Sequence, residues 1–194
     1  MPSRNKRTEF SVVMKNVSNM RKYLFAFPLI AAMLAHNACL AGTPKEVDNS
    51  TVSQLDIHQF MGKWFEIARY DHSFERDMTN VTAEYYLLDD GKIEVINRGF
   101  KNGEPKRIVG KAKQPQPIDY PGRLKVSFFL WFYSDYYILD LDKDYQYAII
   151  GSSSDKYLWI LSRTPEMSEA QLKKILQKIV QRGYDVGKLL FVKQ

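Results

Sequence analysis

Cysteine and histidine are nearly absent from this sequence. Its 194 residues contain one cysteine, Cys39, and three histidines, His36, His58 and His72. A single cysteine cannot form an intrachain disulfide, and it excludes a metal site built from cysteines. The histidines are scattered without ligand spacing, and no Ser–His–Asp arrangement stands out. We therefore predict no metal, no cofactor and no enzyme activity.

Beyond its first 41 residues the chain also lacks an excess of charge of either sign. The whole sequence has 28 Lys and Arg against 22 Asp and Glu, a net charge of +6. Residues 1–41 hold six of the basic residues and one acid, so they carry +5 and the remainder carries +1. No basic stripe is left that would contact a phosphate backbone, and we predict no nucleic-acid partner.

No apolar run is long enough to predict a transmembrane helix. The longest, Leu24–Ala35, has twelve residues, whereas a membrane-spanning helix needs about 20. The short basic segment Met20–Tyr23 precedes the run and small residues follow it, which is the layout of a secretory signal peptide. We predict a signal peptide over residues 1–41, with Met20 as an alternative start. Export across the inner membrane would deliver the protein to the periplasm or the outer membrane.

The end of this leader fits two processing routes. Ala38-Cys39 resembles the end of a bacterial lipoprotein signal, in which the cysteine becomes the lipidated N-terminus, although His36 stands where a leucine-like residue is usual. Ordinary cleavage after Ala41 is the alternative. Lipidation gives the lone cysteine a role, and it favours a membrane anchor at Cys39. Residues 42–54 are then a polar tether without periodicity, and residues 55–194 form the folded domain.

What the sequence does contain is a series of short segments with alternating side chains. The first is Gly62–Tyr70, in which one set of side chains is Trp64, Glu66, Ala68 and Tyr70. This period of two is typical of a β-strand. Seven further segments follow: 79–88, 92–100, 105–113, 123–129, 135–142, 145–151 and 157–163. Asp89-Asp90-Gly91 and Lys101-Asn102-Gly103 are hairpin signals between them.

About eight strands joined mainly by short connections predict an antiparallel barrel or sandwich. Closing eight strands into a barrel removes both edges and leaves room for one small ligand. After Pro165 the period becomes helical, with Ser168 as N-cap and apolar residues from Leu172 to Val180. Gly183 ends this helix, which we expect to pack outside the sheet, and Lys188–Lys193 is a last short strand.

Three segments resemble the sequence motifs of the lipocalin family. Gly62-Lys63-Trp64 matches the Gly-x-Trp motif, Leu141–Tyr145 is similar to the second motif, and Leu158–Pro165 is similar to the third. The likeness runs from about Leu55 to the C-terminus. It is strongest to the bacterial outer-membrane lipoproteins of the family and to apolipoprotein D. It implies an all-β fold: an eight-stranded antiparallel up-and-down β-barrel with a C-terminal α-helix packed outside.

The resemblance also implies structural roles at the closed end of the barrel. Arg163 would stack on Trp64, a cation–π contact of roughly 0.5–2 kcal/mol that seals this end. Leu141 replaces the usual threonine of the second motif, so either Asp142 or Asp144 is the motif acid. The structural residues implied by the three motifs are Gly62, Trp64, Asp142, Tyr145 and Arg163.

Inward side chains of the strands are the predicted ligand-binding set. Strict alternation gives Ala68, Tyr70, Ala83, Tyr85, Val95, Leu124, Val126, Phe128, Tyr137 and Trp159. A shift of one residue would exchange the two faces of a strand. Glu66 and Asn97 are polar among apolar neighbours, and either orient a head group or bond to the backbone. We expect the loop Asp71–Met78 to gate the cavity. The aromatic run Phe129–Tyr133 is a predicted loop at the open end, exposed to a membrane or partner or folded over the ligand.

These features predict a carrier of fatty acids, lysophospholipids or similar apolar molecules in the bacterial cell envelope. A dry cavity stabilises an acyl chain by about 0.8 kcal/mol per CH₂. Two other classes stay open. A filled barrel without a ligand would serve as a membrane or protein interaction module through Phe129–Tyr133. A lipid isomerase would need an inward acid such as Glu66, and a synthase would need a thiol inside the barrel, whereas Cys39 precedes the domain.

Overall fold

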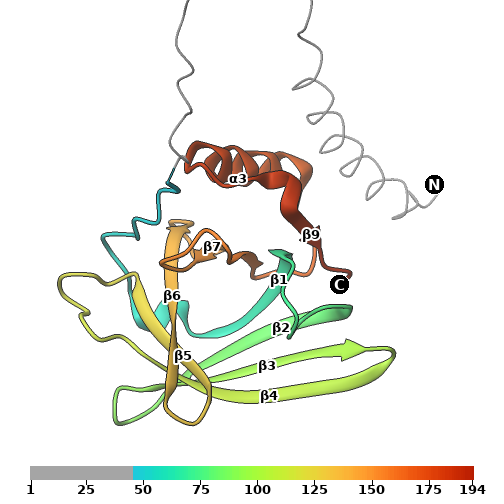
Figure 1. Cartoon of the computed structure of the whole chain (residues 1–194). Coiled ribbons are helices and arrows are strands. Elements are labelled where there is room, and N and C mark those ends of the chain that lie inside the picture. The colour runs from blue at the N-terminus through green and yellow to red at the C-terminus, as the bar shows by residue number, and fades with distance from the viewer. Residues whose placement is uncertain (1–45) are drawn as a thin grey trace, which may run out of the picture.

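The strands of this chain follow one another around a closed barrel (Figure 1). The computed structural model describes residues 46–194. The strands are β1 (Gly62–Tyr70), β2 (Met78–Leu87), β3 (Ile93–Lys101), β4 (Glu104–Lys113), β5 (Arg123–Phe129), β6 (Phe132–Leu141), β7 (Tyr147–Gly151), β8 (Leu158–Ser162) and β9 (Leu189–Phe191). The helices are α2 (Ile57–Phe60), α3 (Glu169–Gln181) and the 3₁₀ helix η1 (Val186–Lys188).

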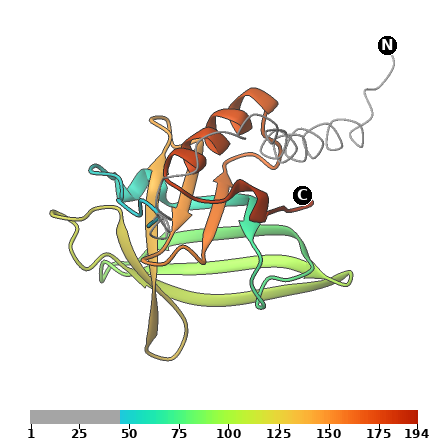
Figure 2. The same cartoon turned by 45° about the horizontal axis from the view of Figure 1, so that its top comes forward.

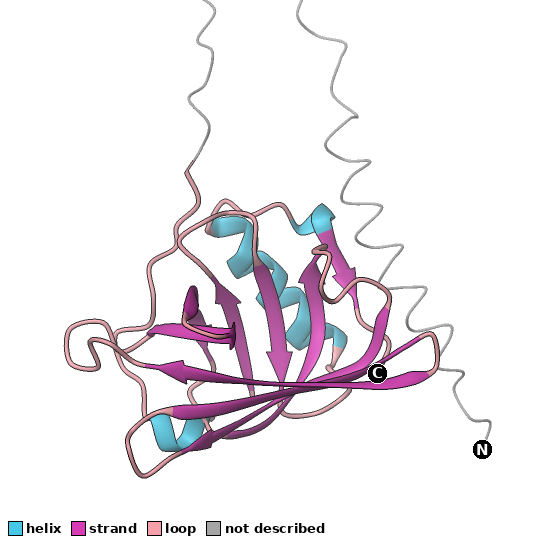
Figure 3. Cartoon of the chain, turned by 60° about the horizontal axis from the view of Figure 1, so that its bottom comes forward, coloured by secondary structure: helices cyan, strands magenta, loops and turns pink. Residues whose placement is uncertain are grey.

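Pairing of β1 with both β8 and β2 closes the ring. The remaining neighbours pair in sequence order from β2 to β8, all antiparallel, and β9 adds to β1 outside the ring. The predicted eight-stranded antiparallel barrel with a C-terminal helix outside is therefore confirmed. Figure 3 shows the strands wrapping around the interior with helix α3 against one side.

Local sequence explains where the elements begin and turn. Asp56 caps α2, since its carboxylate accepts hydrogen bonds from the backbone N–H groups of His58 and Gln59. Asn102 and Gly103 both have positive φ, as a tight hairpin between β3 and β4 requires. Helix α3 begins after Ser168, whose side chain accepts a hydrogen bond from the N–H of Gln171.

The aromatic run after β5 is not the loop that the sequence predicts. Phe129 pairs with Phe132, so only Leu130 and Trp131 lie between β5 and β6. The strand β6 begins at Phe132 and not at Asp135. Aromatic side chains favour the extended conformation, and the two strands therefore continue to the tip of the hairpin.

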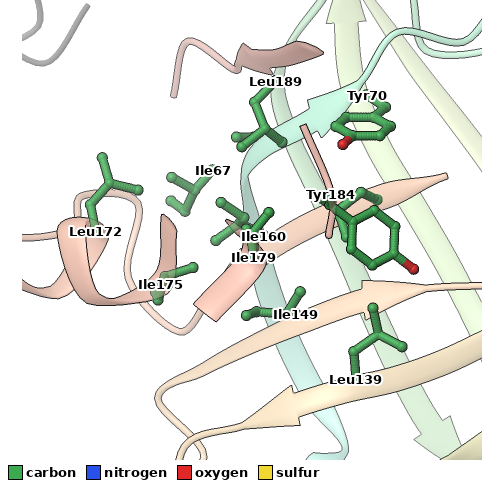
Figure 4. Close-up of a cluster of buried hydrophobic side chains, with 12 residues drawn as sticks. Ile67, Tyr70, Leu139, Ile149, Ile160, Leu172, Ile175, Ile179, Tyr184 and Leu189 are labelled. Carbon is green, nitrogen blue, oxygen red and sulfur yellow. The ribbon is translucent and has the colours of Figure 1, made fainter. Parts of the chain in front are cut away.

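Two hydrophobic clusters lie on opposite faces of the sheet. One fills the closed end of the barrel around Phe60 and Trp64. The other lies between α3 and the outer face of β1, β6, β7 and β8 (Figure 2), where Ile175 and Ile179 of the helix are completely buried. Figure 4 shows Ile179 of the helix beside Ile160 of β8. Helix α3 thus stabilises the outside of the barrel and leaves the interior free.

β-Bulges change which side chains face the interior. The pairing of β1 with β8 shifts between Glu66 and Ala68, and that of β6 with β7 shifts between Ile138 and Asp140. A bulge adds one residue to a strand, so the side chains beyond it change faces relative to strict alternation. In β1 both Ile67 and Ala68 consequently belong to the cluster beneath α3.

Residues 46–54, assigned to the tether in the sequence analysis, run along the outside of the barrel before α2 (Figure 1, cyan). The N–H of Asp48 donates to the carbonyl of Arg182 at 2.8 Å, and the N–H of Val52 donates to the carbonyl of Ile138 at 3.0 Å. Between residues 46 and 194, no helix has the length and apolar character needed to cross a membrane.

Candidate ligand-binding site

A cavity of about 910 Å³ occupies the barrel interior. Its walls are side chains of the seven strands from β2 to β8. Its mouth is formed by the β1–β2, β3–β4, β5–β6 and β7–β8 connections, which share one end of an up-and-down barrel. The volume is near the upper end of the range of about 300–1,000 Å³ for small-molecule sites. The interior is therefore large enough for a ligand.

The opposite end is sealed by the side chains that the sequence motifs single out. The Arg163 guanidinium lies 3.8 Å from the centre of the Trp64 ring. It donates hydrogen bonds to the carbonyls of Gln59 at 2.6 Å and Lys63 at 2.9 Å. Gly62 has a φ of +89°, a left-handed conformation that glycine adopts without strain. The predicted stacking of Arg163 on Trp64 is present, and it forms the floor below the cavity.

The second motif supports this floor from the β6–β7 turn. The carboxylate of Asp142 accepts hydrogen bonds from the N–H groups of Asp144 and Gln146 at 3.1 and 3.2 Å. Asp142, and not Asp144, is thus the acid that shapes the turn. The Tyr145 hydroxyl accepts a hydrogen bond from the N–H of Asp56 at 2.8 Å, which joins the turn to α2.

Three polar side chains lie on the wall of the cavity. The hydroxyls of Tyr85 and Tyr136 are 2.9 Å apart, and burial raises the pKa of both phenols. One hydroxyl donates to the other, which leaves the second proton free to meet a ligand. The Oδ1 atom of Asn97 is buried and has no hydrogen-bond partner within residues 46–194. These groups can pair with a polar atom on an otherwise apolar ligand.

A cluster of buried charges lies beside the β1–β2 loop. Arg69 Nη1 donates to Glu66 Oε1 at 2.6 Å, and its other terminal nitrogen donates to the carbonyl of Glu75. The Trp159 indole N–H donates to Glu75 Oε2 at 3.2 Å, and His72 Nε2 lies 3.1 Å from the same oxygen. Glu75 and Trp159 line the cavity. The cluster holds the loop against the wall of the site.

Burial, and after it the neighbouring carboxylate of Glu75, raises the pKa of Glu66 to about 8, although Arg69 acts in the opposite direction. Both Glu66 and Arg69 are only 4% exposed. With Glu66 protonated, the positive charge of Arg69 balances the negative charge of Glu75. The sequence predicts that the Glu66 carboxyl group orients a head group or bonds to the backbone. In the structure it bonds to the Arg69 side chain.

The mouth carries more positive than negative side chains. Those that line it are Arg98, Lys101, Lys106, Arg107 and Lys125, against Glu75 and Asp135. Lys125 pairs with Asp135 at 2.6 Å, and Lys106 pairs with Glu104 at 2.7 Å. In residues 46–194, no group of three His, Cys, Asp or Glu side chains is arranged to hold a metal ion.

A family model described as a lipocalin-like domain matches residues 55–194. The chain belongs to the lipocalin family. This lipocalin is 42% identical over 169 residues to the outer membrane lipoprotein Blc of Vibrio cholerae, a match that covers 86% of this chain and 96% of that protein. It is 29% identical over 144 residues to apolipoprotein D of Mus musculus, covering 70% and 75% of the two chains. The sequence-based family prediction is confirmed.

A solved structure with the same fold is insecticyanin from the tobacco hornworm Manduca sexta. It superposes on the lipocalin with a TM-score of 0.60 at 23% identity, over 75% of this chain and 84% of its own. This likeness establishes the shared barrel fold. It carries no information on the cavity lining, which differs with the side chains of each protein.

Six of the ten predicted ligand-binding residues line the cavity of the lipocalin. They are Ala83, Tyr85, Val95, Val126, Phe128 and Trp159. Leu124 also points inward, but it is buried in the closed-end cluster with Trp64 and does not line the cavity. The mouth residues Phe74 and Glu75 come from the loop that the sequence predicts as a gate.

Ala68, Tyr70 and Tyr137 do not face the interior as strict alternation predicts. All three lie in or against the cluster beneath α3. Ala68 and Tyr70 follow the bulge of β1, which reverses the faces of its last residues. In β6, Tyr136 faces the cavity and Tyr137 the outside. Two adjacent tyrosines give no alternation from which to choose a face.

Sequence reasoning also missed part of the lining. Ile150 and Leu161 line the cavity from β7 and β8. These two strands, Tyr147–Gly151 and Leu158–Ser162, are almost entirely apolar. One face of each packs towards α3, and the other faces the barrel interior. Such strands lose the alternating pattern. Cys39 and the predicted signal peptide, residues 1–41, lie outside the described residues.

Proposed function

We propose that this lipocalin binds single-chain lipids, such as fatty acids or lysophospholipids, and carries them within the bacterial cell envelope. The observation that carries the proposal is an interior cavity with apolar walls and a mouth rich in cations. An acyl chain inside it would be stabilised by about 0.8 kcal/mol for each buried CH₂ group. Binding would be reversible and would need no covalent step.

The charges at the mouth favour a ligand with an anionic head. Lys101 and Arg107 line the mouth, and neither makes an ion pair within residues 46–194. A carboxylate or phosphate placed between them would gain charge-assisted hydrogen bonds while its chain lies among Val95, Val126 and Phe128. A fatty acid and a lysophospholipid both have this arrangement of one charged head and one chain.

We also propose that lipidated Cys39 anchors the protein in the outer membrane. The relative from Vibrio cholerae is named an outer membrane lipoprotein and aligns over 96% of its length. The alternative of cleavage after Ala41 would produce an unanchored periplasmic carrier. In both cases the ligand would be a lipid of the envelope.

Native mass spectrometry of the purified chain, followed by titration with a fluorescent fatty acid, tests the binding proposal. We expect a co-purified lipid mass or saturable binding at one site. Val126→Trp would fill the cavity from β5 and should weaken binding at least about tenfold, because a bulkier side chain displaces the acyl chain.

Val109→Trp is the matched control for this substitution. Val109 is on the neighbouring strand β4, is 39% exposed and is absent from the cavity lining. Its variant should bind like the wild type. Equal affinities for all three proteins, or no saturable uptake of any lipid class, would refute binding in the cavity.

A further inference from the structure

The tip of the β5–β6 hairpin exposes four large apolar side chains in a row. Phe129, Leu130, Trp131 and Phe132 are 68%, 53%, 71% and 64% exposed. The rings of Phe129 and Phe132 stack with their centres 6.4 Å apart, and Trp131 stacks on Phe132 at 6.0 Å. A continuous exposed apolar group of this kind marks an interaction site.

The backbone at the tip indicates that an apolar side chain is retained there at a conformational cost. Leu130 has a φ of +49°, in the left-handed region. Glycine and asparagine adopt this conformation more readily than a branched apolar residue. The β3–β4 turn uses Asn102 and Gly103 at its positive φ positions. Leucine at the β5–β6 turn is therefore unfavourable for folding, which suggests selection for contact with a partner.

Charge around the hairpin narrows the choice of partner. Residues 46–194 contain 21 Lys and Arg and 21 Asp and Glu. The segment 98–125, which includes β4 and the first three residues of β5, contains eight basic and two acidic residues. It carries +6, so the rest of the described chain carries −6. Lys111 and Lys113 lie over the ring of Tyr133 at 5.8 and 4.5 Å, directly behind the tip.

Phe129 and Phe132 also line the mouth of the cavity. The exposed tip and the apolar interior are therefore one continuous surface. A flat protein partner would cover this mouth. A lipid surface would instead extend the apolar path, and its acyl chains could enter without crossing water.

We propose that the hairpin tip, Phe129–Phe132, inserts into the interface of a membrane that contains anionic lipids. Apolar side chains would enter the boundary between head groups and acyl chains, and the cations of β4 and β5 would contact the phosphates. The mouth then lies against the bilayer, and a single-chain lipid passes directly between membrane and cavity. Docking rests on the proposed envelope location and does not require that the cavity binds lipid.

Vesicle partition of the full chain carrying Cys39→Ala tests this docking. The Cys39→Ala substitution prevents acylation of residue 39. Any contribution of residues 1–41 to vesicle binding is then the same in every variant. Vesicles of phosphatidylcholine with phosphatidylglycerol should bind the chain more tightly than phosphatidylcholine alone, and added salt should weaken the binding. Leu130→Asn with Trp131→Ser should lower partition at least about tenfold. Leu130→Asn alone should lower partition without lowering the melting temperature.

Ile118→Asn is the matched control, because Ile118 is 91% exposed in the β4–β5 connection at the opposite end of the barrel. Its partition should equal that of the parent chain. Brominated phosphatidylcholine should quench tryptophan emission in the parent and less in Trp131→Phe. The two tryptophans left in that variant are Trp64, which is buried at the floor, and Trp159, which lies on the inner wall of the cavity.

Three results would overturn the docking proposal. The first is equal partition of the hairpin variant and the parent. The second is an equal loss for Ile118→Asn. The third is a dimer in the absence of vesicles that the hairpin variant abolishes, which would assign the tip to a second copy. Saturable fatty-acid binding by the hairpin variant, measured in parallel, would show that the cavity is intact and separates failure of docking from failure of lipid binding.

Discussion

At the scale of single residues, the buried charges near the mouth have the clearest consequence. Glu66, Arg69 and Glu75 share a site with little access to water. The Arg69 guanidinium bonds to the carboxylate of Glu66 and to the backbone carbonyl of Glu75, while the Glu75 carboxylate contacts Trp159 and His72. An unbalanced buried charge is costly. Burial of the carboxyl group, and after it the nearby carboxylate of Glu75, therefore raises the pKa of Glu66 to about 8 from an ordinary value of 4.5.

We predict that Glu66 makes the stability of the protein fall as pH rises. The folded state keeps a proton that the unfolded state has already released between the two pKa values. The stabilisation is complete below pH 4.5 and is lost as pH rises through about 8. The free energy of unfolding should fall by up to about 1.4 kcal/mol per pH unit in this window. Thermal or urea unfolding from acidic to alkaline pH measures it.

Glu66→Gln should flatten this dependence, because an amide keeps the shape of the carboxyl group without its charge. Glu104→Gln, at an exposed position of β4, should follow the wild-type curve. His72 and Tyr85 also face the cluster, so His72→Gln serves to separate the histidine's contribution. Parallel stability curves for wild type and Glu66→Gln would contradict the assignment.

At the scale of elements, helix α3 and the barrel interior should be energetically separable. Ile175 is completely buried between the helix and the outer face of the sheet. We predict that Ile175→Ala lowers the free energy of unfolding by about 2–4 kcal/mol by leaving a cavity. Affinity for a fluorescent fatty acid should not change, because the ligand cavity is on the other face of the sheet. Urea unfolding and lipid titration measure the two effects.

Val180→Ala is the control on the same helix, since Val180 is 46% exposed. It should change stability by less than about 0.5 kcal/mol. If Ile175→Ala abolished lipid binding while the protein remained folded, the separation of the two faces would be wrong.

The sequence predicts the positions of the strands and of helix α3 better than it predicts which side chains of each strand face the barrel interior. Alternation and turn residues locate all eight barrel strands, and the capping residue Ser168 locates α3. Alternation cannot locate a bulge in β1, because the second half of this strand is buried on both faces and its side chains do not alternate between exposed and buried. Strict alternation therefore places Ala68 and Tyr70 on the wrong face. Arg69, the partner of Glu66, lies beyond the same bulge. Glu75 comes from a loop, and pattern alone gives no register for a loop.

At the scale of the whole molecule, the anchor and the hairpin would act at the same end of the barrel. The amide of Asn49 donates to the carbonyl of Ser153 at 3.3 Å, and Ser153 lines the cavity mouth. Six residues lie between Cys39 and Glu46, so these two residues can be at most about 25 Å apart in an extended chain. A lipid on Cys39 would therefore keep the mouth within a short distance of the bilayer that the hairpin is proposed to contact.

We predict that the two contacts differ in strength and can be separated by fractionation. One lipidated residue with its acyl chains holds a protein more firmly than a few interfacial side chains aided by charge. Wild type should remain with membranes through a high-salt wash, and Cys39→Ala should be released by it. Leu130→Asn with an intact Cys39 should stay membrane-bound. The mass of the mature chain would show whether it begins at an acylated Cys39 or after Ala41. A Cys39→Ala chain that survives the wash would exclude the anchor, because salt removes the charge attraction on which docking by the hairpin depends.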